Sequence, residues 1–282
     1  MDMVHLNVSE LSRMLNQVGD QLVTLSLGKI NERILSYKTW HRIQFSLPRM
    51  MPKLKKSQMM VDIFECTDIL KDIEKMPVLK MLELGKSTAT KSTCLNEILQ
   101  TICNSGKILG SVRSLTILQM HDATLLKGLK TAFPNLESLA VKTFGKMGEA
   151  GAVSGMELGV VLKGCTGGWE RLKHLSLMLP KYSTKKVDVV KALLDSKDLY
   201  QGLTTFKVWG IRSSPHDLME DEMDLFKQLL IAMDVMDKVT IWNMKFSKES
   251  VKNILGFMTW NKLSVSKFRM FGTCRRLIKA TV

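Results

Sequence analysis

Nine short apolar segments with one common spacing dominate this sequence. The clearest is Leu79-x-x-Leu82-x-Leu84, and the others place apolar residues at the same first, fourth and sixth positions. The segments begin at Leu22, Trp40, Leu79, Val112, Leu136, Leu172, Leu203, Met236 and Val265, with Trp40 opening the weakest match. The eight steps between these starts cover 243 residues, so the mean period is about 30 residues. Self-similarity at such a period is typical of a solenoid, in which each unit buries its apolar face against its neighbours.

Each repeat has the pattern of a strand followed by a helix. The apolar segments alternate with polar residues, as in a half-buried strand, and Gly85 ends the strand that contains Leu82. Helix-start signals lie between the segments: Ser247 precedes one apolar helical pattern, and Ser214 with Pro215 introduces another. Parallel strands joined by right-handed helical crossovers follow from this order. We therefore predict an α/β fold: a single solenoid domain over residues 1–282, curved like a horseshoe, with strands on the concave face and helices on the convex face.

The strand pattern resembles the leucine-rich-repeat family. The consensus L-x-x-L-x-L is met in eight segments, and the resemblance covers residues 8–273, which gives eight or nine irregular repeats. The Asn or Cys that the family places three residues after the last apolar position is replaced, for example by Ser87 and Thr273. The lines NQVGDQLVTLSL and MPVLKMLELGKS are most similar to the repeat region of F-box/leucine-rich-repeat proteins. That resemblance implies substrate selection for a cullin-type ubiquitin ligase. We find no F-box in this chain, so a cullin-ligase adaptor is expected as a partner only if an F-box exists outside it.

Composition constrains the partners and the compartment. The formal charge of +14 favours acidic partners such as acidic or phosphorylated protein segments or nucleic acid. The five cysteines are scattered without metal-binding spacing, which is typical of free thiols in a reducing compartment. The chain opens without the basic and apolar regions of a signal peptide, and it contains no apolar stretch of membrane-spanning length. We therefore expect a cytoplasmic or nuclear protein with no membrane partner.

Motifs for catalysis or cofactor binding are incomplete in this sequence. Gly85-Lys86-Ser87-Thr88 resembles the end of a phosphate-binding loop, but that loop needs a glycine where Lys80 stands. The five glycines of residues 144–159 lack the dinucleotide-binding spacing. Cys165 and His174 have no third residue to orient them as a nucleophile and base. We predict no enzymatic activity, no cofactor and no metal site.

The predicted strands place one set of side chains on the face away from the core. Because side chains alternate along a strand, the third, fifth and seventh positions of each segment should project from the concave face. Basic residues outnumber acidic ones six to one at these positions, and five of the six follow residue 141. The seventh position is aromatic in the last three segments, as Trp209, Trp242 and Phe271. The candidate partner-binding residues are His174, Lys207, Trp209, Lys238, Trp242, Lys267, Arg269 and Phe271.

Aromatic and basic side chains together are typical of protein interfaces. We therefore predict a non-catalytic protein-binding scaffold that binds an acidic or phosphorylated protein segment on the concave face of its C-terminal half. Two other interpretations of the same residues stay open. The rings and cations would also suit single-stranded nucleic acid, or the rings would cover the last repeats as a cap.

Overall fold

The structure is a computed structural model, and it describes residues 8–27, 47–60, 69–85, 94–143, 155–213, 216–242, 244 and 246–271. The chain forms two compact units. Unit 1 comprises Met1–Met120 with Gly128–Leu136, and unit 2 comprises His121–Lys127 with Glu137–Val282. The single domain expected over residues 1–282 stays a prediction.

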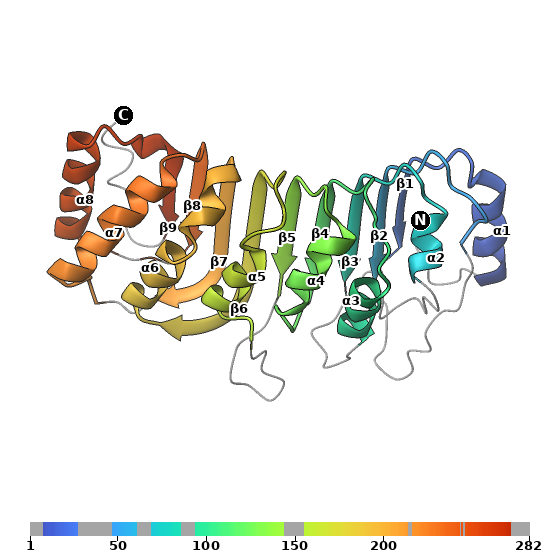
Figure 1. The fold of residues 1–282 in the computed structure, drawn as a ribbon, viewed down its shortest axis with the longest axis horizontal. Helices are drawn as coiled ribbons and strands as arrows, with labels where there is room; N and C mark the ends of the chain where they lie inside the picture. The colour runs from blue at the N-terminus through green and yellow to red at the C-terminus, as the bar shows by residue number, and fades with distance from the viewer. Residues whose placement is uncertain are drawn as a thin grey trace. The chain divides into compact units, whose positions relative to one another are not determined.

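Unit 1 alternates parallel strands with helices. Its strands pair in chain order from β1 to β4, and every pair is parallel. Its elements are α1 (Val8–Val18), β1 (Thr24–Leu27), β2 (Lys56–Met60), α2 (Ile69–Glu74), β3 (Met81–Gly85), α3 (Cys94–Asn104) and β4 (Ser114–Leu118). The helices of this unit lie to one side of its strands (Figure 1).

Unit 2 repeats the same plan over a longer part of the chain. Strands β5 to β9 pair in chain order, and all pairs are again parallel. Its elements are β5 (Ser138–Lys142), α5 (Leu158–Cys165), β6 (His174–Thr184), α6 (Lys186–Leu194), η2 (Lys197–Gly202), β7 (Thr205–Ser213), α7 (Glu220–Met233), β8 (Lys238–Trp242), α8 (Lys248–Trp260), η3 (Val265–Lys267) and β9 (Phe268–Phe271). Between β4 and β5 lies α4 (Leu125–Ala132), which begins in unit 2 and ends in unit 1.

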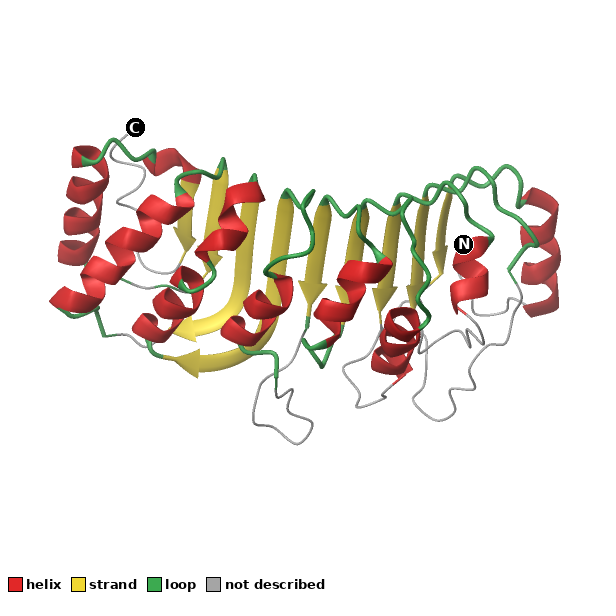
Figure 2. Cartoon of the chain, in the orientation of Figure 1, coloured by secondary structure: helices red, strands yellow, loops and turns green. Residues whose placement is uncertain are grey.

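The predicted alternation of parallel strands and helices is confirmed (Figure 2). The first, fourth and sixth positions of the segments that begin at Leu79 to Met236 form the core, as expected: Leu79, Leu82 and Leu84 are at most 1% exposed. The last segment departs from the expectation, because Val265 lies in the short helix η3 and is 41% exposed. Most positions between the core positions are half-buried or exposed, and β4 and β5 alternate strictly along their length. Thr240 in β8 is an exception at 5% exposed. One face of each strand therefore packs beneath the helices, and the other presents the third, fifth and seventh positions.

The prediction missed one strand. The segment that begins at Trp40 lies outside the described residues, and β1 pairs directly with β2, which the pattern did not predict. In β2 the buried central position holds Ser57, in register with Leu25 and Leu82 of the flanking strands. The buried Ser57 hydroxyl has no hydrogen-bond partner among the described residues. A buried serine at the central position breaks the apolar spacing, and so the strand could not be recognised from it.

Of the two helix starts predicted above, the one at Ser247 is confirmed and the one at Ser214 and Pro215 is wrong. Ser247 caps α8, because its hydroxyl accepts a hydrogen bond from the Ser250 N–H at 3.1 Å. By contrast, α7 starts at Glu220, five residues after Pro215, which lies outside the described residues with Ser214. The backbone N–H of Met219 there donates to the carboxylate of Glu222 at 2.9 Å. A first-turn carboxylate, and not the serine–proline pair, thus satisfies the start of this helix.

Two strands of unit 2 extend beyond the common length. β6 has 11 residues and β7 has nine, whereas β5 and β8 have five each. The pairing of β6 with β7 is irregular between Met178 and Tyr182 and then resumes to Thr184 and Ser213. Gly210 lies at this irregularity with a φ of +100°, in close contact with the Leu179 carbonyl. The strand ends next to the predicted binding face are therefore shaped by a glycine conformation that other residues rarely adopt.

Candidate partner-binding surface

The exposed side chains of β6 to β9 form rows that cross the strands in register. The third-position row contains His174, Thr205 and Lys238, and the fifth-position row contains Ser176, Lys207, Thr240 and Arg269. The seventh-position row begins with Met178 and Trp209, which face one another in register, and continues with Trp242. We call Lys207, Lys238 and Arg269 the basic group, and Met178, Trp209 and Trp242 the apolar row. Both lie entirely in unit 2.

The basic group has no anionic partner within the described part of the chain. Lys207 and Lys238 are half-buried and Arg269 is exposed, and none of the three forms an ion pair with a described residue. The same rows contain no Asp or Glu. Three uncompensated cations on neighbouring strands, about 4.8 Å apart from strand to strand, create a local positive potential. Such a surface attracts an anionic ligand.

The apolar row brings two tryptophans together. The ring centroids of Trp209 and Trp242 lie 6.5 Å apart with their planes tilted by 33°. Trp242 remains 37% exposed, and Trp209 is half-buried. For a base to stack between the two tryptophans, their ring planes would have to be parallel and about 7 Å apart, which is twice the stacking distance of bases. The pair therefore offers an apolar surface without a slot for an intercalated base.

The other predicted residues are placed differently. The exposed His174 hydrogen-bonds through Nδ1 to Oγ1 of Thr205 at 3.0 Å, which fixes the ring within the third-position row. The structure does not bring Lys267 into the basic group. Its ammonium donates to the backbone carbonyl of Asp234 at 2.6 Å and lies 3.6 Å from the carboxylate of the same residue. Asp234 is the C-terminal cap of α7, where carbonyl groups and the helix dipole attract a cation. The backbone of Phe271 lies in β9, but its side chain is outside the described residues.

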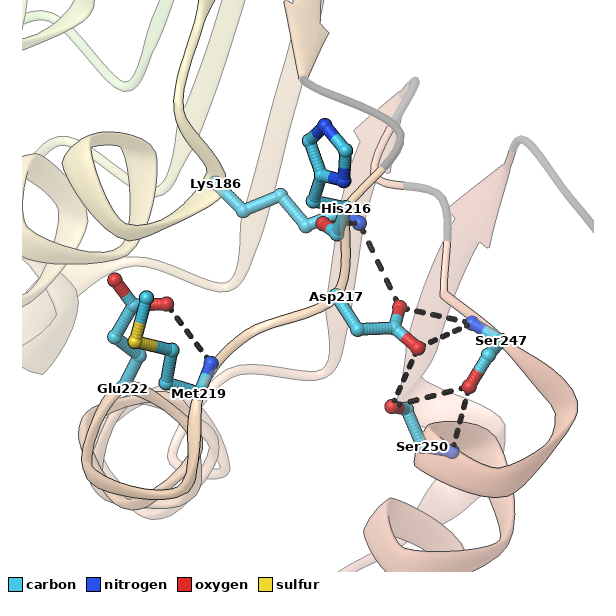
Figure 3. Close-up of polar contacts among 7 residues, drawn as sticks. All are labelled: Lys186, His216, Asp217, Met219, Glu222, Ser247 and Ser250. Atoms are coloured by element: carbon cyan, nitrogen blue, oxygen red, sulfur yellow. Dashed lines mark hydrogen bonds and ion pairs between the residues drawn. The ribbon is translucent and has the colours of Figure 1, made fainter.

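A polar cluster that the sequence analysis missed joins three successive repeats of unit 2 (Figure 3). The buried Lys186, the first residue of α6, donates to the His216 carbonyl, lies 3.7 Å from the Asp217 carboxylate and sits 5.4 Å from the ring centre of Phe246. Asp217 accepts hydrogen bonds from the Ser247 N–H and the Ser250 hydroxyl, both at 3.0 Å. We call this set the Lys186 cluster. Lys186, Asp217 and Ser247 are 31 and 30 residues apart, so the repeat period is the sequence signal that links them.

The Lys186 cluster has the electrostatics of a structural contact. Burial is the largest influence on Lys186 and lowers its pKa, against the opposing effect of Asp217. Desolvation raises the pKa of Asp217, but the hydrogen bonds from Ser247 and Ser250 together with the Lys186 charge outweigh it, so that its pKa is lowered. The Lys186 side chain is only 1% exposed, so no substrate can reach its amine. We therefore assign this cluster to repeat packing.

The described residues contain no group of three or more His, Cys, Asp or Glu side chains that could hold a metal ion. None of the described helices combines the length and apolarity needed to cross a lipid bilayer. The surface of unit 2 that stands out is thus the basic group with the apolar row, on the open face of an α/β fold.

Comparisons with known proteins show only a weak likeness to solved structures. No family model matches the chain, and no curated protein matches it. Among solved structures, the chain is similar to a structural genomics target from Bacteroides fragilis, with 17% identity and a TM-score of 0.42. The match covers 77% of this chain and 57% of that protein, so the chain spans little more than half its length. At this level of similarity no function transfers.

Proposed function

We propose that the protein is a non-catalytic binding scaffold that holds an acidic protein segment on the open face of β6 to β9. The observation that carries the proposal is the basic group: three cations on the neighbouring strands β7, β8 and β9, in rows without a carboxylate, beside the Trp209–Trp242 pair. An acidic or phosphorylated segment supplies the missing anions through charge-assisted hydrogen bonds. The apolar row supplies buried area, and Trp and Arg are the residues that most often anchor an interface.

The same proposal includes the repeat class and the biological setting. Parallel strands repeating at about 30 residues, with the first, fourth and sixth positions in the core, support a leucine-rich-repeat solenoid. By resemblance to F-box/leucine-rich-repeat proteins, the scaffold would select substrates for ubiquitin transfer in the cytoplasm or nucleus. Purification of the full-length protein from its native cells tests this setting. Recovery of cullin adaptors would support it, and their absence would leave only the scaffold.

Replacing two cations of the basic group tests the binding face. We expect Lys207→Gln with Arg269→Gln to weaken binding of an acidic peptide about tenfold or more, because each lost cation removes a charge-assisted contact. Fluorescence anisotropy with a labelled Glu-rich peptide at fixed ionic strength measures the loss. The matched control is Lys248→Gln with Lys252→Gln, which removes the same charge from the exposed side of α8. Equal losses in both variants would show that only net charge matters and would refute the proposed face.

The same anisotropy measurement distinguishes peptide binding from the second candidate function, nucleic-acid binding. A single-stranded oligonucleotide that binds more tightly than the peptide, with a steep dependence of log affinity on log salt, would favour nucleic acid. A base would stack on the exposed face of one ring, and Trp242 is 37% exposed, so the ring pair alone does not distinguish the two ligands. We expect the peptide to bind more tightly, because Trp and Arg are the residues that most often anchor a protein interface.

Trp242 distinguishes a binding face from a cap. We expect Trp242→Ala to weaken peptide binding about tenfold while the melting temperature changes little, because the ring is 37% exposed. The control variant Trp242→Phe keeps a ring and should retain most of the affinity. Early amide exchange throughout β8 and β9 in Trp242→Ala would instead show that the ring holds the last repeats together.

A further inference from the structure

A second charged surface lies entirely within unit 1. The turns that enter β2, β3 and β4 follow one another along one edge of that unit (Figure 2). Each turn is closed in the same way, because the N–H groups of Leu54, Leu79 and Val112 each donate to the backbone carbonyl three residues earlier. Equivalent residues of successive repeats are therefore neighbours across the strands, and what one repeat presents at this edge adds to what the next presents.

Lysines gather at this edge. Lys53, Lys55, Lys56 and Lys80 are all exposed, and none of them forms an ion pair with a described residue. We call these four residues the lysine patch. The backbone N–H of Lys80 donates to the carbonyl of Lys55 at 2.9 Å, so these two lysines stand side by side on adjacent strands. Four ammonium groups within two repeats create a positive potential that attracts a polyanionic surface.

Exposed aliphatic side chains lie among these lysines. The carbonyl of Val23 accepts a hydrogen bond from the N–H of Lys55 at 2.9 Å, which places Val23 beside the patch on the β1 side. Val78 and Met81 stand on either side of Lys80 in the chain. The exposed fractions are 50% for Val23, 39% for Val78 and 46% for Met81. A partner that covers the lysine patch therefore also covers aliphatic surface.

The described residues of unit 1 present no aromatic side chain to a partner. Phe133 is the one aromatic residue among them, and it is fully buried. Interfaces between proteins are enriched in aromatic residues and Arg and depleted in Lys. Single-stranded nucleic acid is held by rings on which its bases stack. The composition of this surface therefore disfavours a protein partner and a single strand.

The aliphatic side chains distinguish an anionic membrane from the backbone of a double-stranded nucleic acid. Lysines attract both, since both present phosphate groups. A phosphate backbone is polar, so Val78 and Met81 gain nothing by lying against it. At an anionic bilayer, aliphatic side chains beside lysines enter the boundary between headgroups and acyl chains, where their burial is favourable.

We propose that unit 1 attaches the protein to the surface of an anionic lipid bilayer through the lysine patch, with Val78 and Met81 entering the headgroup region. This attachment goes beyond the proposed function, which uses side chains of unit 2. The expectation of no membrane partner rested on the lack of a signal peptide and of a spanning segment in the sequence. Attachment to a bilayer surface requires neither.

Co-sedimentation of the full chain with lipid vesicles tests the proposal. We expect the protein to bind vesicles of phosphatidylcholine mixed with phosphatidylserine and not to bind vesicles of phosphatidylcholine alone. Lys53→Gln, Lys55→Gln and Lys80→Gln together should weaken binding to the mixed vesicles about 100-fold, because each lysine near an anionic surface contributes about fivefold. All three side chains are exposed, so the melting temperature should not change.

The matched control variant is Lys163→Gln with Lys191→Gln and Lys248→Gln. It removes the same net charge from exposed positions of α5, α6 and α8 in unit 2. We expect it to bind the mixed vesicles within about threefold of the unchanged protein, because its lysines lie outside the patch. Equal losses in the two triple variants would show that only net charge attracts the vesicles, and would overturn the proposal.

Val78→Thr with Met81→Gln tests the aliphatic contribution, because it keeps every charge and nearly the same side-chain shape. We expect it to weaken vesicle binding about fivefold or more, since polar groups gain nothing in the headgroup region. Unchanged vesicle binding, together with tighter binding of double-stranded DNA that the triple variant of the lysine patch abolishes, would assign the patch to nucleic acid. Equal binding to the two kinds of vesicle would also overturn the proposal. Peptide binding by Lys207 and Arg269 is measured separately, so it stands or fails independently.

Discussion

Gly210→Ala is expected to cost about 3 kcal/mol or more of the free energy of unfolding, and at that cost the C-terminal repeats lose their order. A Cβ at this position would lie 1.9 Å from the carbonyl oxygen of Leu179, far inside contact distance, and the obstacle is backbone that cannot rotate away. The φ of +100° adds strain for any residue with a side chain. Urea denaturation followed by circular dichroism measures the loss.

Gly256 provides the matched control. It lies in the exposed part of α8 with ordinary helical backbone, and a Cβ there would meet no atom within 4 Å. We expect Gly256→Ala to raise the free energy of unfolding by up to about 1 kcal/mol, because alanine has less freedom to lose in a helix. Similar stability for Gly210→Ala and the unchanged protein would contradict the described pairing of β6 with β7. In that event the shape of the strand ends beside Trp209 would also be wrong.

The regular part of this fold follows from the apolar spacing alone. Positions such as Leu79, Leu82 and Leu84 are buried because a parallel strand beneath a helix needs three apolar contacts at that spacing. The same period of two predicted that Trp209 and Lys207 project from the opposite face, and Trp209 does contact Trp242 there. The strand that contains Ser57 was not predicted, because a polar residue stands at the buried position where the spacing requires an apolar one.

The fate of each lysine could not be predicted in this way. Lys267 occupies the third position of its segment, yet its long side chain turns to the carbonyl and carboxylate of Asp234 at the end of α7. Lys186 stands at a helix start, where a solvated cation is the usual expectation, and it is buried on Phe246 instead. Both outcomes depend on where the neighbouring repeat has oxygen atoms that can accept a hydrogen bond. The sequence of a single repeat does not predict where those acceptors lie.

Removing the carboxylate from the Lys186 cluster should be almost as damaging as the change at Gly210. We expect Asp217→Ala to cost about 2–3 kcal/mol of the free energy of unfolding. Breaking a buried ion pair from one side costs about 3–5 kcal/mol, and the cost is smaller here because Asp217 is 30% exposed and the Lys186 Nζ–carboxylate distance is 3.7 Å. The variant leaves a buried ammonium with the His216 carbonyl and the Phe246 ring, and it removes the acceptor for Ser247 and Ser250 at the start of α8. Chemical denaturation at pH 7 gives the value.

A second substitution shows whether the buried charge is the cause. Lys186→Met in the Asp217→Ala background should restore part of the stability, because an apolar chain of similar length no longer needs a counter-charge.

The pH dependence of the free energy of unfolding has a definite sign. The pKa of Lys186 in the folded protein is below its ordinary value of 10.5, so the unfolded state binds more protons between the two values and stability rises with pH there. Without Asp217 the folded pKa falls further, so the deficit of Asp217→Ala should shrink as the pH is raised towards 10. A deficit that is constant from pH 7 to 10, or a double variant less stable than Asp217→Ala, would show that the Ser247 and Ser250 hydrogen bonds, and not the buried ammonium, set the cost.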